Sequence, residues 1–297
     1  MTRGGITGRI FVVGVPRSGT TLLQALLAAH DDVTSFTESH LFDRSFSVVS
    51  GLGPILTSDP TPRLVEFLAE NDASELDAAR WFGPPPPLEL RWRAFMPMRT
   101  RRVARRLVDV LDEIALRRGA SVWLEKTPRN LRSIPLLERV CDDGVPAHFV
   151  HLVRDGLETV ASLRRASKQW ERTYTLDECV RRWNHDVALT VGRLGEPGHH
   201  AVLYEALTTD PEAVLRPLLA ALELPWQPEI LTGYGEAAQG VVAADESWKD
   251  GVGREIRPSA TAGLELGEQQ RDHVTASLHS NLYDAVATQA VGGARHG

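Results

Sequence analysis

Hydrophobic and polar residues follow two alternating patterns along most of the chain. Apolar runs with the length of a β-strand lie at 10–13, 33–36, 120–124, 147–153 and 200–204. Apolar residues with helical spacing follow them, at 20–30, 130–139, 155–168, 176–194 and 211–222. Strands that alternate with helices of this length predict right-handed crossovers in an open, parallel α/β sheet flanked by helices.

Segment 41–120 interrupts this alternation. Apolar spacing over 62–80 predicts one or two amphipathic helices, and a longer helix is predicted at about 97–118. Between them, the proline-rich stretch 83–87 breaks regular structure, because proline cannot donate a backbone hydrogen bond. We therefore expect 41–120 to be a helical insertion that walls a pocket over the sheet.

The C-terminal part of the chain has a different composition. Residues 235–262 are rich in glycine, alanine and charge and have no clear period, which favours a mobile loop. A closing helix is predicted at about 266–288.

The charge and cysteine content argue against several classes of protein. With 33 Lys and Arg against 39 Asp and Glu, the net charge of −6 disfavours a nucleic-acid-binding protein and an acidic macromolecular substrate. Cys141 and Cys179 are too few for a disulfide framework and are expected to be reduced thiols. Residues 1–9 hold no apolar leader, and no apolar run approaches the about 18 residues of a membrane span. We expect a cytoplasmic monomer or homodimer without membrane contact.

The first strand runs into a loop bounded by Gly14 and Gly19. This spacing is that of the phosphate-binding P-loop, G-x-x-x-x-G-K-[ST], but Thr20 stands in the lysine position and Arg17 lies within the loop. Backbone amides and the dipole of the following helix attract an anion, whereas the missing lysine does not suit triphosphate chemistry. The residues expected to hold the anion are Arg17, Ser18, Gly19, Thr20 and Thr21.

A second anion site is predicted where strand 147–153 ends. Arg154 follows that strand directly, and Ser162 lies two helical turns along the next helix. An arginine fork and a serine hydroxyl placed in this way can converge on one phosphate. Two anion sites suggest a nucleotide with two separate phosphate groups. Because both must share one sheet, we expect 1–297 to form a single domain.

The two motifs resemble the phosphosulfate loop and the 3′-phosphate site of sulfotransferases that use 3′-phosphoadenylyl sulfate (PAPS). The resemblance is to the tyrosylprotein sulfotransferase branch, and it covers about 10–40 and 121–265 but not 41–120. The segments that carry it are 14–22, 29–33, Glu38, 153–156, 182–184, 204–207, 210–212 and 256–258. The resemblance implies a P-loop-like fold with PAPS as co-substrate and adenosine 3′,5′-bisphosphate (PAP) as product.

The resemblance also implies catalytic roles. Lys126 matches the lysine that stabilises the leaving oxygen in the transition state, and Ser247 is similar to a serine with a related role. Glu38 matches the glutamate that serves as general base, which a carboxylate beside a partly dry pocket can do. His40 is the nearest rival base, because imidazole titrates near neutrality.

Further contacts to the nucleotide are implied near the end of the chain. Tyr204 is expected to hydrogen-bond the second phosphate or to pack near the adenine. Lys249, Arg254 and Arg257 are expected to close over the nucleotide with the loop that carries them. No H-E-x-x-H motif or His/Cys cluster suggests a metal site, so no metal is expected.

The leading hypothesis is therefore a transferase that moves a sulfuryl group from PAPS to a hydroxyl of a small-molecule or peptidyl acceptor, with an amine as the less favoured acceptor. Tyrosine, a phenol, a sugar, and a lipid or polyketide alcohol all stay open. One alternative is a P-loop kinase of a small alcohol, disfavoured by Thr20 and by the second phosphate site. Another is a non-catalytic nucleotide-binding module, disfavoured by the presence of both Glu38 and Lys126.

Overall fold

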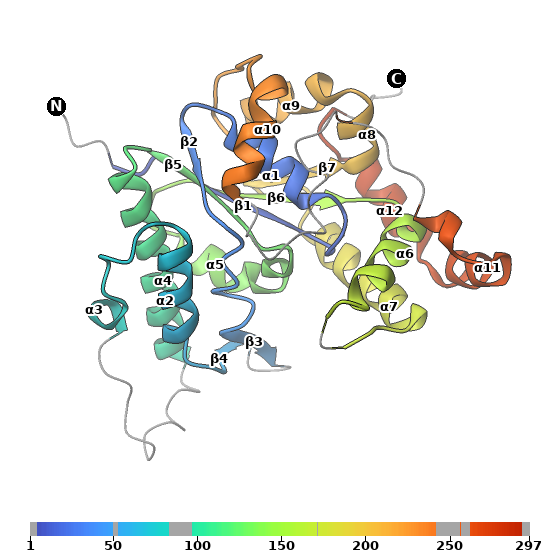
Figure 1. Cartoon of the computed structure of the whole chain (residues 1–297), viewed down its shortest axis with the longest axis horizontal. Coiled ribbons are helices and arrows are strands. Elements are labelled where there is room, and N and C mark those ends of the chain that lie inside the picture. The colour runs from blue at the N-terminus through green and yellow to red at the C-terminus, as the bar shows by residue number, and fades with distance from the viewer. Residues whose placement is uncertain are drawn as a thin grey trace.

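The core of the molecule is a five-stranded parallel sheet with the strand order β2-β5-β1-β6-β7 (Figure 1). The computed structural model describes residues 5–49, 53–82, 97–170, 172–241, 256 and 262–292. The strands are β1 (Gly8–Gly14), β2 (Val33–Ser35), β5 (Val122–Lys126), β6 (Ala147–Val153) and β7 (His199–Leu203). This confirms the predicted open parallel sheet.

Helices cover both faces of this sheet (Figure 1). Alternate residues of β1 point to opposite faces, so that Ile10 and Val12 pack against one group of helices and Phe11 and Val13 against another. The first group is α1 (Thr20–Ala28), α9 (Pro211–Ala221) and α10 (Ile230–Val241), and the second is α2 (Thr61–Glu70), α4 (Pro97–Arg117) and α5 (Ile134–Val140). Burial on both faces explains why the strands were readable as continuous apolar runs.

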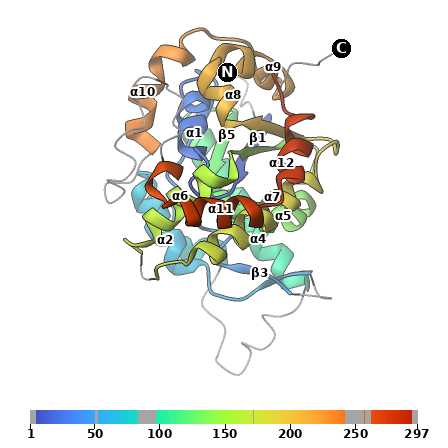
Figure 2. The same ribbon diagram turned by 90° about the vertical axis from the view of Figure 1, so that its right-hand side faces the viewer.

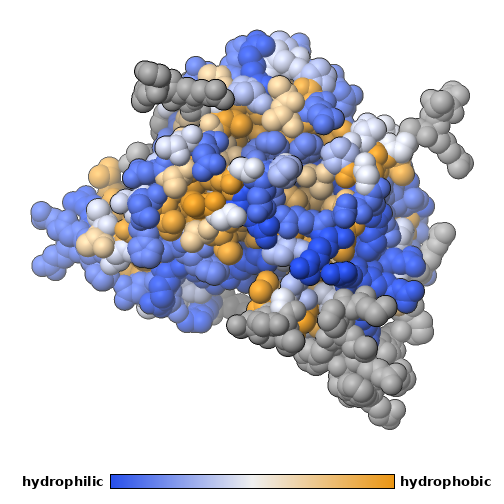
Figure 3. Space-filling model, turned by 180° about the vertical axis from the view of Figure 1, so that it is seen from behind, coloured by the Kyte–Doolittle hydropathy of each residue, from blue (hydrophilic) through white to orange (hydrophobic). Residues whose placement is uncertain are grey.

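A third hydrophobic cluster covers the carboxyl ends of β6 and β7. It joins Val153 and Ala201 of the strands to Val160 and Trp183 of two helices, α6 (Gly156–Ser167) and α7 (Leu176–Val191). Figure 2 shows α11 (Glu268–Ser277) lying across these two helices. On the reverse side of the molecule, apolar residues show mainly near the centre and hydrophilic residues surround them (Figure 3).

The insertion is not wholly helical. The predicted helices are present as α2, α3 (Ala78–Phe82) and α4, but an antiparallel hairpin of β3 (Phe46–Val49) and β4 (Gly53–Leu56) precedes them. Strands of four residues are too short to show a period in the sequence. The hairpin is held by its contacts instead, because Phe46 and Leu56 are buried and the Leu56 N–H donates to Thr100 Oγ1 of α4 at 3.1 Å.

Two predictions about the C-terminal part were wrong. Part of the predicted loop is helical, since α10 continues to Val241, with Tyr234 and Ala238 buried in the cluster that contains α1. Most of the rest of that predicted loop lies outside the described residues. The closing helix is two helices, α11 and α12 (Ser280–Ala287). Leu278 is extended between them, and Asn184 of α7 stabilises the break by donating to the Ser277 carbonyl and accepting from the His279 N–H.

Three boundaries also moved. β5 continues through Glu125 and Lys126, two polar residues that end an apolar pattern but are buried in the sheet. A 3₁₀ turn, η2 (Pro128–Ser133), precedes α5, and Tyr204 begins a short helix, α8 (Tyr204–Thr209), instead of ending β7. In the part of the chain that the structure describes, no helix combines the length and apolar composition needed to cross a bilayer.

Candidate active site

The loop after β1 has a backbone that only glycine can adopt at its two ends. Gly19 has a φ of 99°, and a Cβ there would lie 2.4 Å from Cδ2 of Tyr204. A Cβ on Gly14 would lie 2.3 Å from the carbonyl oxygen of Leu152 in β6. Arg17, between them, is left-handed with a φ of 75°. The glycine spacing seen in the sequence therefore reflects close packing of the loop against β6 and Tyr204.

The loop leads into an uncapped helix. Ser18 is buried, and its hydroxyl donates to the carbonyls of Val15 and Leu152 at 2.7 and 3.3 Å while its N–H donates to Val15. Its side chain therefore fastens the loop to β6. Thr20 and Thr21 form the first turn of α1, where Gly19 provides no side-chain cap and no residue is acidic. A helix N-terminus of this kind favours an anion.

Glu38 and Lys126 form an ion pair at the carboxyl ends of β2 and β5. The Lys126 Nζ donates to Glu38 Oε2 at 2.5 Å, although the two residues lie 88 positions apart in the chain. Lys126 is 1% exposed and the Glu38 side chain 16%. Parallel pairing of β2 with β5 brings them together, because the ends of parallel strands meet at one edge of a sheet.

His40 extends this pair into a row of ionisable groups. Its Nε2 lies 3.5 Å from Glu38 Oε1, and its Nδ1 lies 3.2 Å from Oδ1 of Asp43, whose side chain is 3% exposed. Arg129 of η2 lies 3.9 Å from the other oxygen of Asp43. Glu38 and His40, the two residues predicted as alternative general bases, are therefore in contact. Asp43 was missed in the sequence, although its position three residues after His40 was a usable signal.

The second anion site was predicted at Arg154 and Ser162, with Tyr204 nearby. Arg154 is buried directly after β6, its guanidinium carbon lies 4.5 Å from the centroid of the Tyr204 ring, and Ser162 is buried on α6. Burial raises the pKa of the Tyr204 phenol, so its hydroxyl stays a neutral donor. Since the same ring limits space at Gly19, Tyr204 contacts residues of both predicted anion sites.

Two residues without a predicted role support Arg154. Glu158, one helical turn along α6, accepts from Arg154 Nη2 at 3.2 Å and from the backbone N–H groups of Ala262 and Gly263 at 3.0 Å. The indole of Trp183 donates to the Arg154 carbonyl at 3.1 Å. The four-residue spacing of Glu158 was visible in the sequence, whereas the contact of Trp183 depends on the fold.

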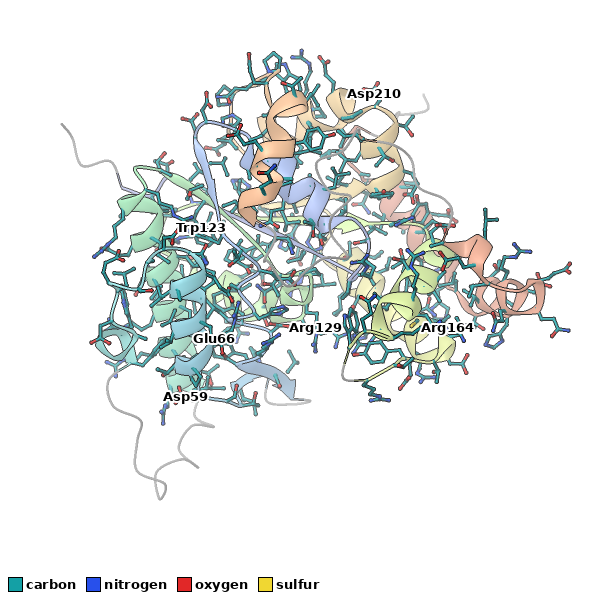
Figure 4. The ribbon with its side chains drawn as sticks, viewed as in Figure 1. Asp59, Glu66, Trp123, Arg129, Arg164 and Asp210 are labelled. Carbon is teal, nitrogen blue, oxygen red and sulfur yellow. The ribbon has the colours of Figure 1, made fainter. Side chains whose placement is uncertain are left out.

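Four predicted site residues lie outside the described residues: Ser247, Lys249, Arg254 and Arg257. In Figure 4, Arg129 lies near the middle of the molecule, between the insertion that carries Glu66 and the helix that carries Arg164.

Two described cavities, of about 460 and 430 Å³, adjoin Tyr174 near the start of α7. Neither is lined by a predicted site residue, so they do not alter the position of the candidate site.

One group in the described part of the chain has the spacing of metal ligands. Glu138, Glu196 and His199 place one ligand atom each within 4.8 Å of one another. Arg193 pairs with Glu138 at 3.0 Å and with Glu196 at 2.9 Å. The guanidinium thus already supplies positive charge to both carboxylates.

Comparison of the sequence with profiles of known protein families identifies the family of this chain. The profile described as the sulfotransferase family matches residues 9–228, a span that includes both predicted anion sites, Glu38 and Lys126. The chain belongs to the sulfotransferase family. The sulfotransferase family predicted from the motifs is therefore confirmed.

Curated relatives carry the name of the branch that the motifs resemble. Protein-tyrosine sulfotransferase of Drosophila melanogaster is 28% identical over 227 residues, covering 75% of this chain and 39% of the relative. Protein-tyrosine sulfotransferase 1 of Homo sapiens is 28% identical over 229 residues, covering 75% of this chain and 53% of the relative. The chain thus spans about half the length, or less, of these relatives.

Solved sulfotransferase structures have the same fold. The sulfotransferase domain of the Synechococcus PCC 7002 olefin synthase gives a TM-score of 0.59 at 18% identity, covering 93% of this chain and 96% of that domain. The sulfotransferase domain from the curacin biosynthetic pathway gives 0.54 at 20% identity, covering 92% and 97%. A mouse sulfotransferase complexed with PAP gives 0.51 at 11% identity, covering 98% and 86%.

Proposed function

We propose that this protein transfers a sulfuryl group from PAPS to a hydroxyl of an acceptor and releases PAP. One observation carries the proposal: the glycine-bounded loop after β1 and Arg154 after β6 lie on neighbouring strands, with the Lys126–Glu38 pair at the ends of the strands beyond β1. The name of the relatives and the PAP in the mouse structure support this chemistry. Both phosphate motifs share one sheet, so we also propose that the chain acts as a single domain.

The described residues fit a nucleotide with phosphate groups at two positions. The first site offers Arg17 and an uncapped helix without acidic residues, which suits the 5′-phosphosulfate. The second offers Arg154 and Ser162 for the 3′-phosphate, with Tyr204 between the two sites. We propose that Lys249, Arg254 and Arg257 add contacts from the C-terminal segment.

Transfer requires a base and a stabilised leaving oxygen. In the proposed reaction the acceptor oxygen bonds to sulfur as the bond from sulfur to the phosphate oxygen breaks, and Glu38 takes the acceptor proton. The Lys126 ammonium, with Ser247, stabilises charge on the leaving oxygen. Lys126 is paired with Glu38 in the structure, so attraction of the ammonium to the donor's oxygens frees the carboxylate to act as base.

The acceptor is proposed from the relatives and the insertion. By their name the relatives act on protein tyrosine, so a peptidyl or small-molecule phenol is the first acceptor class to test. Segment 41–120, which carries the β3–β4 hairpin and α2 to α4, is proposed to wall the acceptor side.

Calorimetry with PAP and with ATP plus magnesium tests the donor. We expect PAP to bind and ATP to bind at least about 100-fold more weakly, because the loop lacks the P-loop lysine. A preference for ATP would support the kinase alternative. Tight binding of PAP without transfer from labelled PAPS to any phenol, sugar or lipid alcohol would support the non-catalytic module.

The same transfer assay identifies the base. Glu38→Gln should lower kcat by about 10²- to 10⁴-fold, the usual contribution of a general base, whereas His40→Gln should have a smaller effect. The reverse order of effects would assign the role of base to His40.

A further inference from the structure

Glu125 is a carboxylate that the proposed reaction does not use, yet it is completely buried at 0% exposure. An ionised carboxylate removed from water costs several kcal/mol unless hydrogen bonds or opposite charges compensate. Its position, directly before Lys126 in β5, places it beside the candidate active site. A carboxyl group buried at this position requires a structural or functional reason.

Three donors surround this carboxylate. Oε1 accepts from the hydroxyls of Ser39 at 2.6 Å and Thr127 at 2.5 Å, and Oε2 accepts from Asn130 Nδ2 at 2.8 Å. Burial raises the pKa of Glu125, while these donors act in the opposite direction. Because every partner donates, the arrangement suits a carboxylate that only accepts.

The same two hydroxyls also accept hydrogen bonds from the backbone of the loop that carries Glu38. Thr127 Oγ1 accepts from the His40 N–H at 3.2 Å, and Ser39 Oγ accepts from the Leu41 N–H at 3.3 Å. His40 has a left-handed φ of 52°, a conformation that costs energy in a residue other than glycine and persists only when its surroundings hold it. Glu125 thus supports the backbone of residues 39–41.

Arg63 of α2 holds the same loop from its other side. Its guanidinium donates to the carbonyls of Ser39 at 2.7 Å and Glu38 at 2.9 Å, and it is paired with Glu70. The N–H groups of the loop therefore depend on Glu125, and its carbonyl groups on Arg63. Between these contacts the Glu38 side chain reaches Lys126.

We infer that Glu125 is a positioning residue that holds Glu38 at its working distance from Lys126. Consecutive residues of β5 bind consecutive residues of the loop, since Glu125 holds Ser39 and Lys126 holds Glu38. The inference rests on the proposed function for its catalytic meaning. Its structural part, that Glu125 holds the backbone of residues 39–41 in place, can be measured without any assay of transfer.

Glu125→Gln is the main test, with Thr127→Val as a second variant that removes one hydroxyl link at nearly constant volume. The glutamine can be accommodated, because the buried Asn130 Oδ1 has no hydrogen-bond partner among the described residues and can accept from the new amide if Asn130 turns its side chain. Asp186→Asn is the matched control. Asp186 is an equally buried carboxylate, on α7, paired with Arg132 at 2.8 Å.

Both Glu125→Gln and Thr127→Val should lower kcat by about 10- to 100-fold, the usual result of misplacing a catalytic group by about 1 Å, with the Kd for PAP unchanged within about threefold. Hydrogen exchange at the amides of residues 39–41 should become faster in both variants. Asp186→Asn should lower stability but change neither kcat nor this exchange.

An unchanged kcat in Glu125→Gln, or unchanged exchange at residues 39–41, overturns the inference. If Glu125→Gln does not fold, Thr127→Val decides by the same two measurements. If the unaltered protein transfers no sulfuryl group, the proposed function fails, and the exchange measurement alone still accepts or rejects the positioning role.

Discussion

The two proposed anion sites of this protein are built in different ways. The first, residues 14–21, depends on backbone: two glycines with positive φ, and the N-terminus of α1. The second depends on side chains: Arg154 and Ser162, with Arg154 held by Glu158 and Trp183. One ring, that of Tyr204, packs against both.

This difference predicts opposite kinds of sensitivity. A site made of close-packed backbone has no room for an added atom, so it should fail when a side chain is enlarged. A site made of side chains should fail when atoms are removed, either from the arginine itself or from the groups that hold it. The predictions below test this contrast, beginning with the largest expected effect on PAP binding and ending with an effect on stability.

Gly19→Ala should reduce the affinity for PAP by about 100-fold. The new Cβ would lie 2.4 Å from the Tyr204 ring at a φ of 99°, and strain and overpacking each cost about 1–3 kcal/mol. Calorimetry measures the loss. The control is Gly233→Ala on α10, where the nearest atom to a Cβ is 3.8 Å away and affinity should not change. Normal PAP binding by Gly19→Ala would mean that the loop does not hold the ligand.

Arg154→Ala should weaken PAP binding by about 30-fold, because a charge-assisted hydrogen bond contributes about 1.5–3 kcal/mol. Adenosine 5′-phosphate lacks the 3′-phosphate, so its affinity should stay within about twofold. Titrating both ligands into the same variant provides the control. Equal losses for the two nucleotides would show that Arg154 does not recognise the 3′-phosphate.

Trp183→Phe should weaken PAP binding by about fivefold, since it removes the indole N–H that donates to the Arg154 carbonyl, a bond of about 1 kcal/mol. The smaller ring also leaves a cavity at this buried position, which lowers stability. Trp123→Phe is the matched control, because the Trp123 indole donates to Asp112 at 2.8 Å on the opposite side of the core. It should lower the melting temperature without affecting PAP. If both variants bind PAP alike, Trp183 acts only on stability.

The last prediction concerns the stability of the protein in acid, not PAP binding, and the groups involved lie in the half of the sheet that carries the proposed second site. Burial, together with neighbouring histidines, lowers the pKa of His151 to about 3 and that of His200 to about 4. Ring nitrogens of His200 and His148 lie 3.1 Å apart, and those of His151 and His199 lie 2.9 Å apart. Two pairs of imidazoles thus link the side chains of β6 and β7. The folded protein keeps His151 and His200 neutral.

An unfolded histidine takes up a proton near pH 6.5, and these two folded ones do not until the pH is much lower. The unfolded state therefore binds more protons below pH 6.5, and stability should fall as the pH decreases from about 6.5 to 4, with no effect above about 7. Melting temperature against pH measures this. His200→Gln should flatten the dependence, whereas His185→Gln, at an exposed position on α7, should leave it unchanged.

The sequence was most informative where local backbone decides the structure. The spacing of Gly14 and Gly19 identified a loop whose φ values and packing require glycine. The strands were readable because both faces of the sheet are buried. The sequence was least informative about the β3–β4 hairpin and the break at Leu278. Four-residue strands are too short to show a period, and the break depends on hydrogen bonds from Asn184 of a distant helix.

By itself the sequence determined the parallel sheet and the family, and it gave the residue types proposed for both anion sites, because these depend on patterns within a few residues. Only the tertiary structure decided which side chains meet: Lys126 with Glu38, Tyr204 with both sites, and Glu125 with the loop at Ser39. The physical reason is that parallel strands bring their carboxyl ends to one edge of the sheet from positions far apart in the chain, and a local pattern contains no record of which ends become neighbours.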